Sequence, residues 1–225
     1  QNNMGAFGGP DIVTDGLIFA VDAGSTRSYP GTGTVATDLV GSKTGTLTNG
    51  VGFNSNNGGS WDFDGTDDYI NFGVTGFDFG TGNFNVSCWI KTTMTNASYT
   101  GVVSKYSTTG LWIQLTPTNK YVGFGWHGST FLLSTTTPVN NGAWRHISCQ
   151  RTGSTTAEIY VDGVLITSGV GSSASSDSTH QLDIGRIDVS GRYFDGDISN
   201  TMLYNKALTA AEISQNYNAQ KNRFI

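Results

Sequence analysis

The sequence predicts an all-β protein of two antiparallel sheets, with one short helix near the C-terminus. Charged residues make up only 13% of the 225 residues, about half of the usual share of about 25%. A helical bundle would need charged and helix-forming residues at helical periods, so that class is excluded. The 31 glycines divide the chain into short segments, and the aromatic share of 12% is enough to fill a core and exclude disorder.

The charge pattern excludes two classes of partner. The net charge is −5, and the twelve lysines and arginines are scattered singly along the chain. A protein without a basic stripe has no electrostatic footprint for nucleic acid or for an anionic membrane surface. No apolar run approaches the roughly 18–20 residues of a membrane span. Because the sequence begins with Gln1, we take it as processed or excised, so a missing signal peptide is uninformative.

The N-terminal segment differs from the rest of the chain. Residues 1–15 are polar, rich in glycine and without periodicity. They are interpreted as an extended arm, and residues 16–225 as a single domain. We expect the arm to lie against a neighbouring copy or another part of an assembly, since it cannot fold alone. The alternative is an unstructured terminus.

Short strands separated by turn residues follow the arm. An apolar strand from Leu17 to Val21 ends at Asp22-Ala23-Gly24, and residues 60–72 hold two strands around an Asp64-Gly65 turn. Residues 84–91 alternate between apolar and polar, which predicts a half-buried strand. A hairpin turns at Asp162-Gly163. Further strands are expected at 102–105, 111–115, 121–127, 144–151, 157–161, 164–166, 182–185 and 194–204, and a long exposed loop at 167–179.

One helix is signalled near the C-terminus. Thr209 and Glu212 have the spacing of a capping box, and Leu208 and Ile213 have that of a hydrophobic staple. Many short strands followed by one late helix predict a two-sheet antiparallel sandwich of jelly-roll type.

The order of several motifs resembles a known family. In the last 80 residues these are WRHI at 144–147, EIYVDG at 158–163, LDIGR at 182–186, FDGDI at 194–198 and LYNKALT at 203–209. Upstream, FDG at 63–65 and FNVSCW at 84–89 fit as well. Together they resemble the LamG-like jelly roll of the concanavalin A-like lectin/glucanase superfamily, which includes the pentraxins, over residues 16–220. The N-terminal stretch 9–31 is similar to LamG-like proteins of marine bacteriophages.

An enzyme is not expected. Glycoside hydrolysis needs two carboxyls flanking one bond, and the glucanases of this superfamily carry alternating acids on one strand. The only two glutamates are Glu158, which has no acidic neighbours, and Glu212, which belongs to the helix cap. Asp62 and Asp64 alternate, but Asp64 belongs to a turn. Hydrolysis of laminarin, agar or chitin oligomers that is lost in Asp62→Asn would contradict this expectation.

The resemblance also implies a possible structural calcium ion, as related jelly rolls bind calcium near their first and last strands. Asp22 and Asp197 are the matching candidates. The alternative, which we favour, is that Asp22 caps a turn and Asp197 bonds backbone amides. The paired pentraxin site is not reproduced, because the loop 187–191 holds one carboxylate, Asp188.

Carbohydrate binding needs flat aromatic faces and side chains that bond hydroxyl groups. Two sets of candidates remain after strand patterns place Trp89, Trp126 and Trp144 in the core. The first is Trp112 with Gln114, and the second is Tyr193 with Arg186 and Asp188. For each aromatic the alternative is burial, the commoner fate of large aromatic residues.

The two cysteines, Cys88 and Cys149, lie on predicted core faces. In pentraxins the matching strands are cross-linked by a disulfide, with each cysteine one residue nearer the N-terminus. Equal shifts turn both side chains to the opposite face together, so a bridge stays possible. We expect two neighbouring buried free thiols, because a phage protein assembles in a reducing cytosol.

Three functions follow, in order of preference. The first is a lectin-like adhesion protein on a virion surface, or alternatively on a cell surface or extracellular, that recognises surface polysaccharide. The second is a purely structural capsid-decoration or tail subunit that contacts other virion proteins and has no sugar ligand. The third is a glycoside hydrolase. In the first two, the chain is part of a homo-oligomer or larger assembly.

Overall fold

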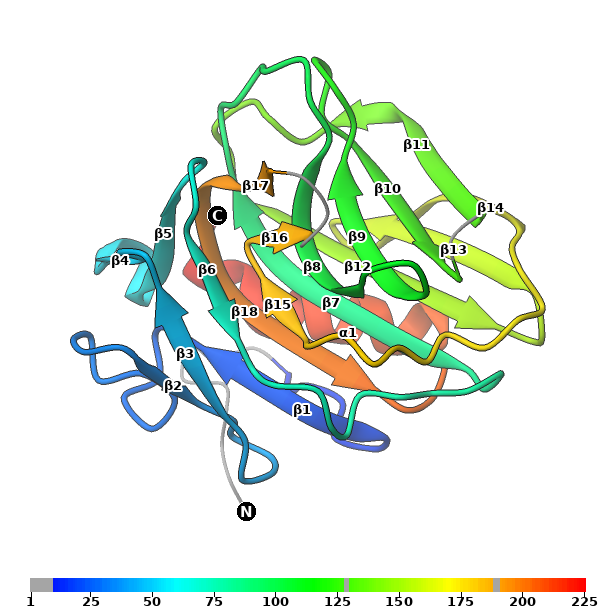
Figure 1. The fold of residues 1–225 in the computed structure, drawn as a ribbon, viewed down its shortest axis with the longest axis horizontal. Helices are drawn as coiled ribbons and strands as arrows, with labels where there is room; N and C mark the ends of the chain where they lie inside the picture. Colours follow the sequence, from blue (N-terminus) through cyan, green and yellow to red (C-terminus); the bar gives the residue numbers. More distant parts are fainter. Residues whose placement is uncertain (1–9, 128–129, 188–190) are drawn as a thin grey trace.

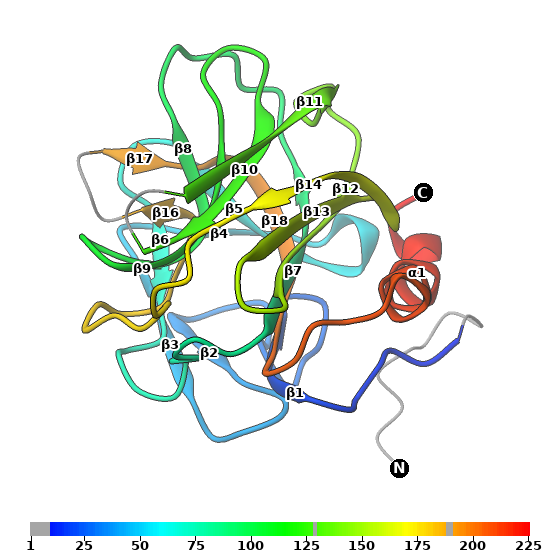
Figure 2. The ribbon, with the colours of Figure 1, turned by 90° about the vertical axis from the view of Figure 1, so that its right-hand side faces the viewer.

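The computed structural model describes residues 10–127, 130–187 and 191–225, and no side chains between 130 and 136. Two antiparallel sheets of eight strands pack face to face (Figure 1). The helix α1 covers the outer side of one sheet, and a two-stranded hairpin covers the outer side of the other (Figure 2). The predicted two-sheet jelly-roll sandwich with one short C-terminal helix is confirmed.

Sheet A lies next to the helix, and its strand order is β14-β13-β12-β7-β18-β5-β4. The long strand β18 pairs with β5 through its first half and with β1 through its second half. The strands are β1 (Leu17–Asp22), β4 (Gly52–Asn54), β5 (Ser60–Asp64), β7 (Phe84–Lys91), β12 (Arg145–Thr152), β13 (Thr156–Val161), β14 (Val164–Val170) and β18 (Asp195–Tyr204).

Sheet B has the order β11-β10-β9-β8-β15-β6-β3-β2. Its strands are β2 (Val35–Thr37), β3 (Thr44–Thr48), β6 (Tyr69–Asn71), β8 (Thr100–Tyr106), β9 (Gly110–Leu115), β10 (Tyr121–Trp126), β11 (Thr130–Pro138) and β15 (Asp183–Ile184). A separate hairpin consists of β16 (Arg186–Ile187) and β17 (Arg192–Tyr193). The strands on either side of the Asp64-Gly65 turn, β5 and β6, belong to different sheets, so this turn connects the layers.

The main core lies between the sheets. The buried rings of Phe84, Phe124 and Trp126 meet there, with ring centres 5.6–6.1 Å apart. The expectation that Trp126 packs in the core is therefore confirmed. The strand β7 is not half-buried as expected, since Phe84 to Ile90 are all buried. Its polar face is covered as well, because Trp89 stacks on Phe224 beyond the helix, with centres 4.3 Å apart.

The helix α1 (Ala210–Gln220) begins at the predicted capping box. Thr209 Oγ1 accepts a hydrogen bond from Glu212 N, and the Glu212 carboxylate accepts one from Thr209 N. Leu208 and Ile213 are both buried in the cluster beneath the helix, as expected for the staple. A short 3-10 turn from Lys221 to Arg223 follows. Among the described residues, no helix has the length and apolar character needed to cross a membrane.

Replacing the N-cap residue tests where this helix begins. Thr209→Ala should lower the free energy of unfolding by about 0.5–2 kcal/mol, because one of the first backbone amides loses its acceptor. Chemical denaturation of both proteins measures the difference. A loss below a few tenths of a kcal/mol would show that the cap contributes little. The exposed Thr26→Ala variant is the control and should leave the stability unchanged.

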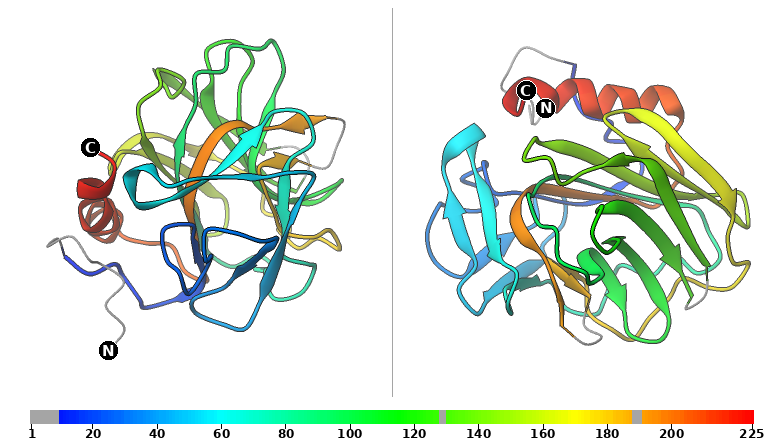
Figure 3. Two further views of the ribbon diagram at one scale, coloured as in Figure 1. Left: turned by 90° about the vertical axis from the view of Figure 1, so that its left-hand side faces the viewer. Right: turned by 90° about the horizontal axis from the view of Figure 1, so that it is seen from above.

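The described part of the arm, residues 10–15, packs on its own chain. Ile12 and Val13 are buried in the cluster beneath α1. Val13 N donates to Asn216 Oδ1 at 2.8 Å, and Tyr204 Oη donates to Val13 O at 2.9 Å. Figure 3 shows this segment running beside the helix. Helix and arm thus satisfy each other's polar groups within one chain; a contact of the arm with a neighbouring copy or another part of an assembly stays a prediction, and residues 1–9 lie outside the described residues.

Three basic side chains are fully buried and tie loops together: Lys105, Lys120 and Arg151. Lys105 Nζ bonds Asp78 Oδ1 at 2.7 Å and the carbonyl of Ser178. The Arg151 guanidinium donates to the carbonyls of Gly80, Ser154 and Ala174. The expectation of a long exposed loop at 167–179 is therefore only partly correct, because Ser176 and Ser178 are buried while Val170 and Ser173 are exposed. The segment continues β14 to Val170 and then supplies carbonyls to two buried cations.

The two cysteines are buried free thiols in the structure. Cys88 on β7 pairs with Ile147, and Cys149 on β12 pairs with Val86, so the two thiols are diagonal neighbours on the core face. Burial raises the pKa of Cys88 to about 12, which keeps this thiol protonated.

Candidate functional site

The first pair of candidates, Trp112 and Gln114, lies on β9 and points away from the core. Leu111, Ile113 and Leu115 alternate with them and belong to the main core cluster. Trp112 and Gln114 therefore lie on the outer face of sheet B, since side chains two apart on a strand share a face. Only 7% of Trp112 and 6% of Gln114 are exposed.

The hairpin β16–β17 packs directly on this face. Gly101 on β8 makes the close approach possible, because a β-carbon there would lie 2.2 Å from the carbonyl carbon of Arg186 and from Ile187 N. Ser104 Oγ, on the same strand, donates to Arg186 O at 2.9 Å. Gly101 pairs with Gln114, and Ser104 pairs with Trp112. The hairpin thus lies against β8, the strand that pairs with β9 (Figure 1).

Part of the second set of candidates, Arg186 and Tyr193, therefore lies near the first set, Trp112 and Gln114. Arg186 and Tyr193 are cross-strand partners in the hairpin, and the hairpin adjoins Gln114 through Arg192. Asp188 lies outside the described residues.

Arg192 is the residue that joins the two sets, and the sequence interpretation missed it. Its Nη1 donates to Gln114 Oε1 at 3.3 Å. Its guanidinium carbon lies 5.4 Å from the ring centre of Tyr99, which is 38% exposed. The arginine thus presents a planar donor group between an amide and an aromatic ring. Its position next to Tyr193 was the available sequence signal.

Aromatic and glycine residues shape the floor of the face. The rings of Trp112 and Tyr106 have centres 4.5 Å apart at an angle of 54°. On the neighbouring strand β10, Gly125 lies opposite Trp112 and Gly123 lies opposite Gln114. These glycines place no side chain beside the two candidates.

Arg186 is held by a buried network beneath the hairpin. Its Nε donates to Asp183 Oδ2 at 2.8 Å, and its guanidinium carbon lies 3.5 Å from the ring centre of Tyr69. Asn71 Nδ2 donates to the other oxygen of Asp183 at 2.9 Å. Burial raises the pKa of Asp183, while Arg186 and the amide donors lower it. This network anchors the start of the hairpin to β6 and β15.

The two candidate metal ligands are engaged by protein groups. Asp22 caps a turn through Gly24 N, as favoured from the sequence, and both of its oxygens also bind Arg223 Nη1 at 2.7 and 2.8 Å. Asp197 was expected to bond backbone amides, but its Oδ1 instead accepts from two side chains, from Ser60 Oγ at 2.6 Å and from Asn54 Nδ2 at 3.2 Å. A guanidinium on Asp22 supplies the positive charge that a calcium ion would bring, so this pair fits a cation poorly.

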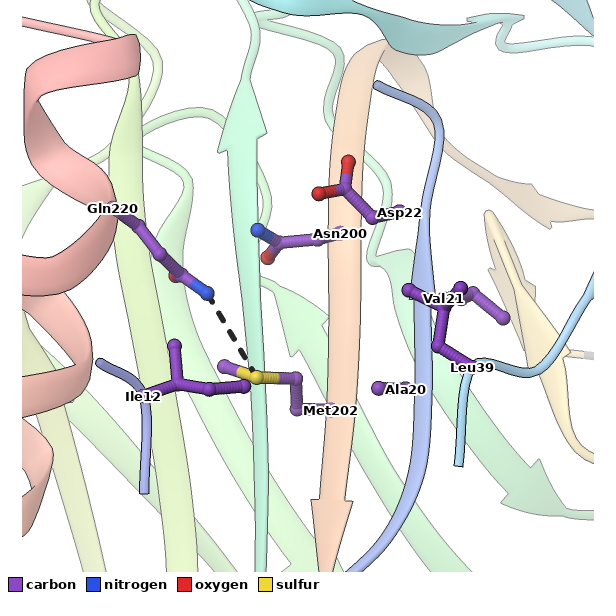
Figure 4. Close-up of a pocket in the computed structure, with 8 residues that line it drawn as sticks. All are labelled: Ile12, Ala20, Val21, Asp22, Leu39, Asn200, Met202 and Gln220. Carbon is purple, nitrogen blue, oxygen red and sulfur yellow. Dashed lines mark hydrogen bonds between the residues drawn. The ribbon is translucent and has the colours of Figure 1, made fainter. Parts of the chain in front are cut away.

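A small hollow is lined by residues of the arm, β1, β18 and the C-terminal end of the helix (Figure 4). Its volume of about 20 Å³ has room for about one water molecule. Asn200 Oδ1, which is buried and has no hydrogen-bond partner within the described residues, belongs to its wall. The lining residues are Ile12, Ala20, Val21, Asp22, Leu39, Asn200, Met202 and Gln220. The hollow is too small for a sugar.

The family can be stated from the sequence itself. Residues 64–214 match a family described as the concanavalin A-like lectin/glucanases superfamily. The chain belongs to this superfamily. The matched range includes β6 to β18 and with them every described residue of the candidate face. No curated protein sequence matches the chain.

Solved structures share the fold at low sequence identity. The binding domain of Paraclostridial Mosquitocidal Protein 1 has a TM-score of 0.76 and 15% identity over 91% of this chain. Domain 4 of an extracellular arabinanase from Geobacillus stearothermophilus, in complex with arabinotriose, has 0.68 and 17% over 89% of this chain and 98% of its own. The receptor binding domain of botulinum neurotoxin type G has 0.70 and 15% over 92%. This chain covers 52% of each toxin domain, about half its length.

Proposed function

We propose that this protein is a non-enzymatic, lectin-like adhesion or structural protein of a virion or cell surface that recognises carbohydrate through the outer face of sheet B. The observation that carries the proposal is the placement of Arg192 between Gln114 and Tyr99. A sugar ring offers C–H groups to an aromatic face and hydroxyl groups to a planar donor. Both kinds of group meet at this point.

The solvent exposure of each side chain indicates which residues would contact a sugar directly and which would support them. Tyr99 and Arg192 are partly exposed, whereas Trp112 and Gln114 are nearly covered. An incoming sugar therefore contacts Tyr99 and Arg192 directly, while Gln114 orients the arginine and Trp112 supports the floor. Two of the structural neighbours support a binding role, since one was solved with arabinotriose and another is a receptor binding domain.

Removing the guanidinium tests this assignment. Arg192→Ala should weaken binding to whichever polysaccharide a glycan array identifies by at least about tenfold, since a hydrogen bond to a charged group contributes about 1.5–3 kcal/mol. Isothermal titration with the identified oligosaccharide measures the change. Arg27→Ala, which removes an exposed arginine from the β1–β2 loop, is the control and should bind normally. Equal binding by Arg192→Ala and the native protein would contradict the assignment.

A second function, that of a capsid-decoration or tail subunit without a sugar ligand, is favoured by a different observation. Three apolar side chains on β14 are exposed: Val164 by 62%, Leu165 by 46% and Val170 by 82%. Such a strand edge suits contact with another protein. A blank glycan array, together with stoichiometric co-purification of the protein with particles, would decide for this function.

Catalysis is not part of the proposal. Asp62 and Asp197 are cross-strand partners on β5 and β18, on the opposite sheet from the candidate face. Burial, followed by the charges of Asp197, Asp195 and Asp64, raises the pKa of Asp62. Asp197 is buried and its Oδ1 is held by Ser60 and Asn54, so we do not assign this pair a role in hydrolysis. Hydrolysis of glycan oligomers that disappears in Asp62→Asn would overturn this view.

A further inference from the structure

A histidine is buried between sheet A and the C-terminal half of α1. His146 lies on β12 and is only 1% exposed. Its cross-strand partner on β7 is Trp89, and the centres of the two rings are 5.4 Å apart. The ring centre of Tyr217, on the helix, lies 6.1 Å from that of the imidazole. Aromatic rings from the sheet and from the helix therefore enclose the imidazole.

Both nitrogens of this imidazole lack a hydrogen-bond partner within the described residues. A protonated imidazole carries two N–H donors and a charge, and both would be buried without compensation. Transfer of such a charge out of water is costly unless it is paired. Burial accordingly lowers the pKa of His146 from 6.5 to about 3. The docked helix therefore requires a neutral imidazole.

The carboxylates around His146 are already engaged with other groups. The ionisable side chains of the strands, turn and helix that pack around it, apart from those on the core face, are Lys91, Arg145, Glu158, Tyr160, Asp162, Glu212, Tyr217, Lys221 and Arg223. Asp162 accepts from Arg145 Nη1 at 2.7 Å and from the backbone N of His146 at 2.9 Å. Glu158 accepts from an amide side chain, and Glu212 from a lysine. An imidazolium would therefore compete with existing partners for every acid in this set.

The helix can leave sheet A without opening the core between the sheets. Ile213, Ala219 and Phe224 pack in two smaller clusters on the outer side of sheet A. No residue from 210 to 225 belongs to the main core cluster. The end of the helix is held by Trp89, whose Nε1 donates to Gln220 Oε1 at 2.7 Å. Release would therefore expose His146 and this aromatic cluster to water and leave the sandwich closed.

We propose that protonation of His146 releases α1 and the turn that follows it from sheet A in mildly acidic solution. In the released state the imidazole reaches water and takes up the proton that the docked state excludes. The docked state keeps its full stability above pH 6.5 and loses it as the pH falls from 6.5 toward 3. At pH 4.5 the equilibrium should have moved toward release by about a hundredfold, tenfold for each pH unit. This switch does not depend on the proposed sugar site.

Other titrating groups act in the opposite direction or at lower pH. Burial is the main cause that raises the pKa of Asp62 and of Asp183. Protonation of these two acids therefore stabilises the fold as the pH falls. The hydrogen bond from Lys206 is the main cause that lowers the pKa of Glu212, so the contribution of Glu212 is lost below its ordinary pKa of 4.5. The range from pH 6.5 to 4.5 therefore reports on the histidines.

Hydrogen–deuterium exchange of the whole chain tests the proposal. The native protein and His146→Phe are compared at pH 7.5 and at pH 4.5, so that the intrinsic exchange rate cancels at each pH. Phenylalanine keeps a ring between sheet and helix but cannot take up a proton. The ratio of native to variant exchange rates for peptides of α1 should rise about a hundredfold at the lower pH. For peptides of β9 and β10 this ratio should not change.

Further measurements keep the test decisive. His146→Met also removes the titrating group and replaces the first variant if the larger ring disturbs packing. In the native protein alone, exchange in α1 relative to β9 should rise by the same factor. His127→Asn and His180→Asn remove the other two histidines and should retain the native response; asparagine suits the positive φ of 52° at His127. The proposal is overturned if the helix ratio is equal at both pH values, if β9 accelerates as much as the helix, or if either control loses the response.

Discussion

Gly101→Ala should lower the free energy of unfolding by about 3 kcal/mol or more, and it should abolish glycan binding. The added methyl group would lie 2.2 Å from the Arg186 carbonyl carbon and Ile187 N, and 2.7 Å from Arg186 O. These are backbone atoms and cannot rotate out of the way. The hairpin β16–β17 must therefore lift from sheet B, which removes Arg192 from Gln114.

A second strand glycine provides the matched control. Gly52 on β4, like Gly101, has a backbone conformation that other residues adopt readily. The nearest atom to a methyl group added at Gly52 is Asp62 Cβ at 3.3 Å. Gly52→Ala should change the free energy of unfolding by less than about 1 kcal/mol. Urea denaturation measures both variants. Native stability in Gly101→Ala would show that the hairpin does not pack as closely as described.

The second large effect is expected from a buried cation. Arg151→Met should lower the free energy of unfolding by roughly 3–5 kcal/mol, because each buried acceptor left unsatisfied costs about 1–3 kcal/mol. The carbonyls of Ser154 and Ala174 would lose this donor, whereas the carbonyl of Gly80 would keep Ser176 N and Oγ as donors. Methionine keeps much of the volume and the contact with Trp126, so the loss reports the hydrogen bonds rather than a cavity.

The control for this variant is an arginine that pairs near the surface. Arg145 bonds Asp162 at 2.7 Å with a quarter of its side chain exposed. Arg145→Met should cost no more than about 1 kcal/mol, as exposed ion pairs contribute little. Guanidinium denaturation compares the two variants. A similar small loss for both would mean that the loop carbonyls around Arg151 find other donors.

Local sequence predicted the elements whose signals are local. The capping box at Thr209 and the Asp162-Gly163 hairpin are confirmed, because each depends on residues within a few positions of one another. The two central residues of the hairpin have positive φ angles of 53° and 80°, as its tight turn requires. In contrast, the alternation in residues 84–91 indicated polar and apolar faces but not that a helix covers the polar one.

The parts that escaped prediction depend on distant partners. Nothing within residues 167–179 indicates that their carbonyls face Lys105 and Arg151, since both cations come from other strands. The same holds for the candidate face. Trp112 and Gln114 were identified by alternation on one strand, but their contact with Arg192 is created by a hairpin 78 positions away in the sequence. Residue type and alternation therefore predicted the candidate residues. Their contact in the fold depends on Gly101, which lets the hairpin pack closely on sheet B.

The contact between arm and helix also determines how the domain is presented. Ile12 and Val13 at one end of the described chain, and α1 with Phe224 at the other, pack on the outer side of sheet A. The hairpin with Arg192 lies on the outer side of sheet B (Figure 2). Any support joined to this domain through either end would therefore lie on the side of sheet A, opposite the candidate face. The candidate face would then be turned outward, toward whatever surface the support approaches.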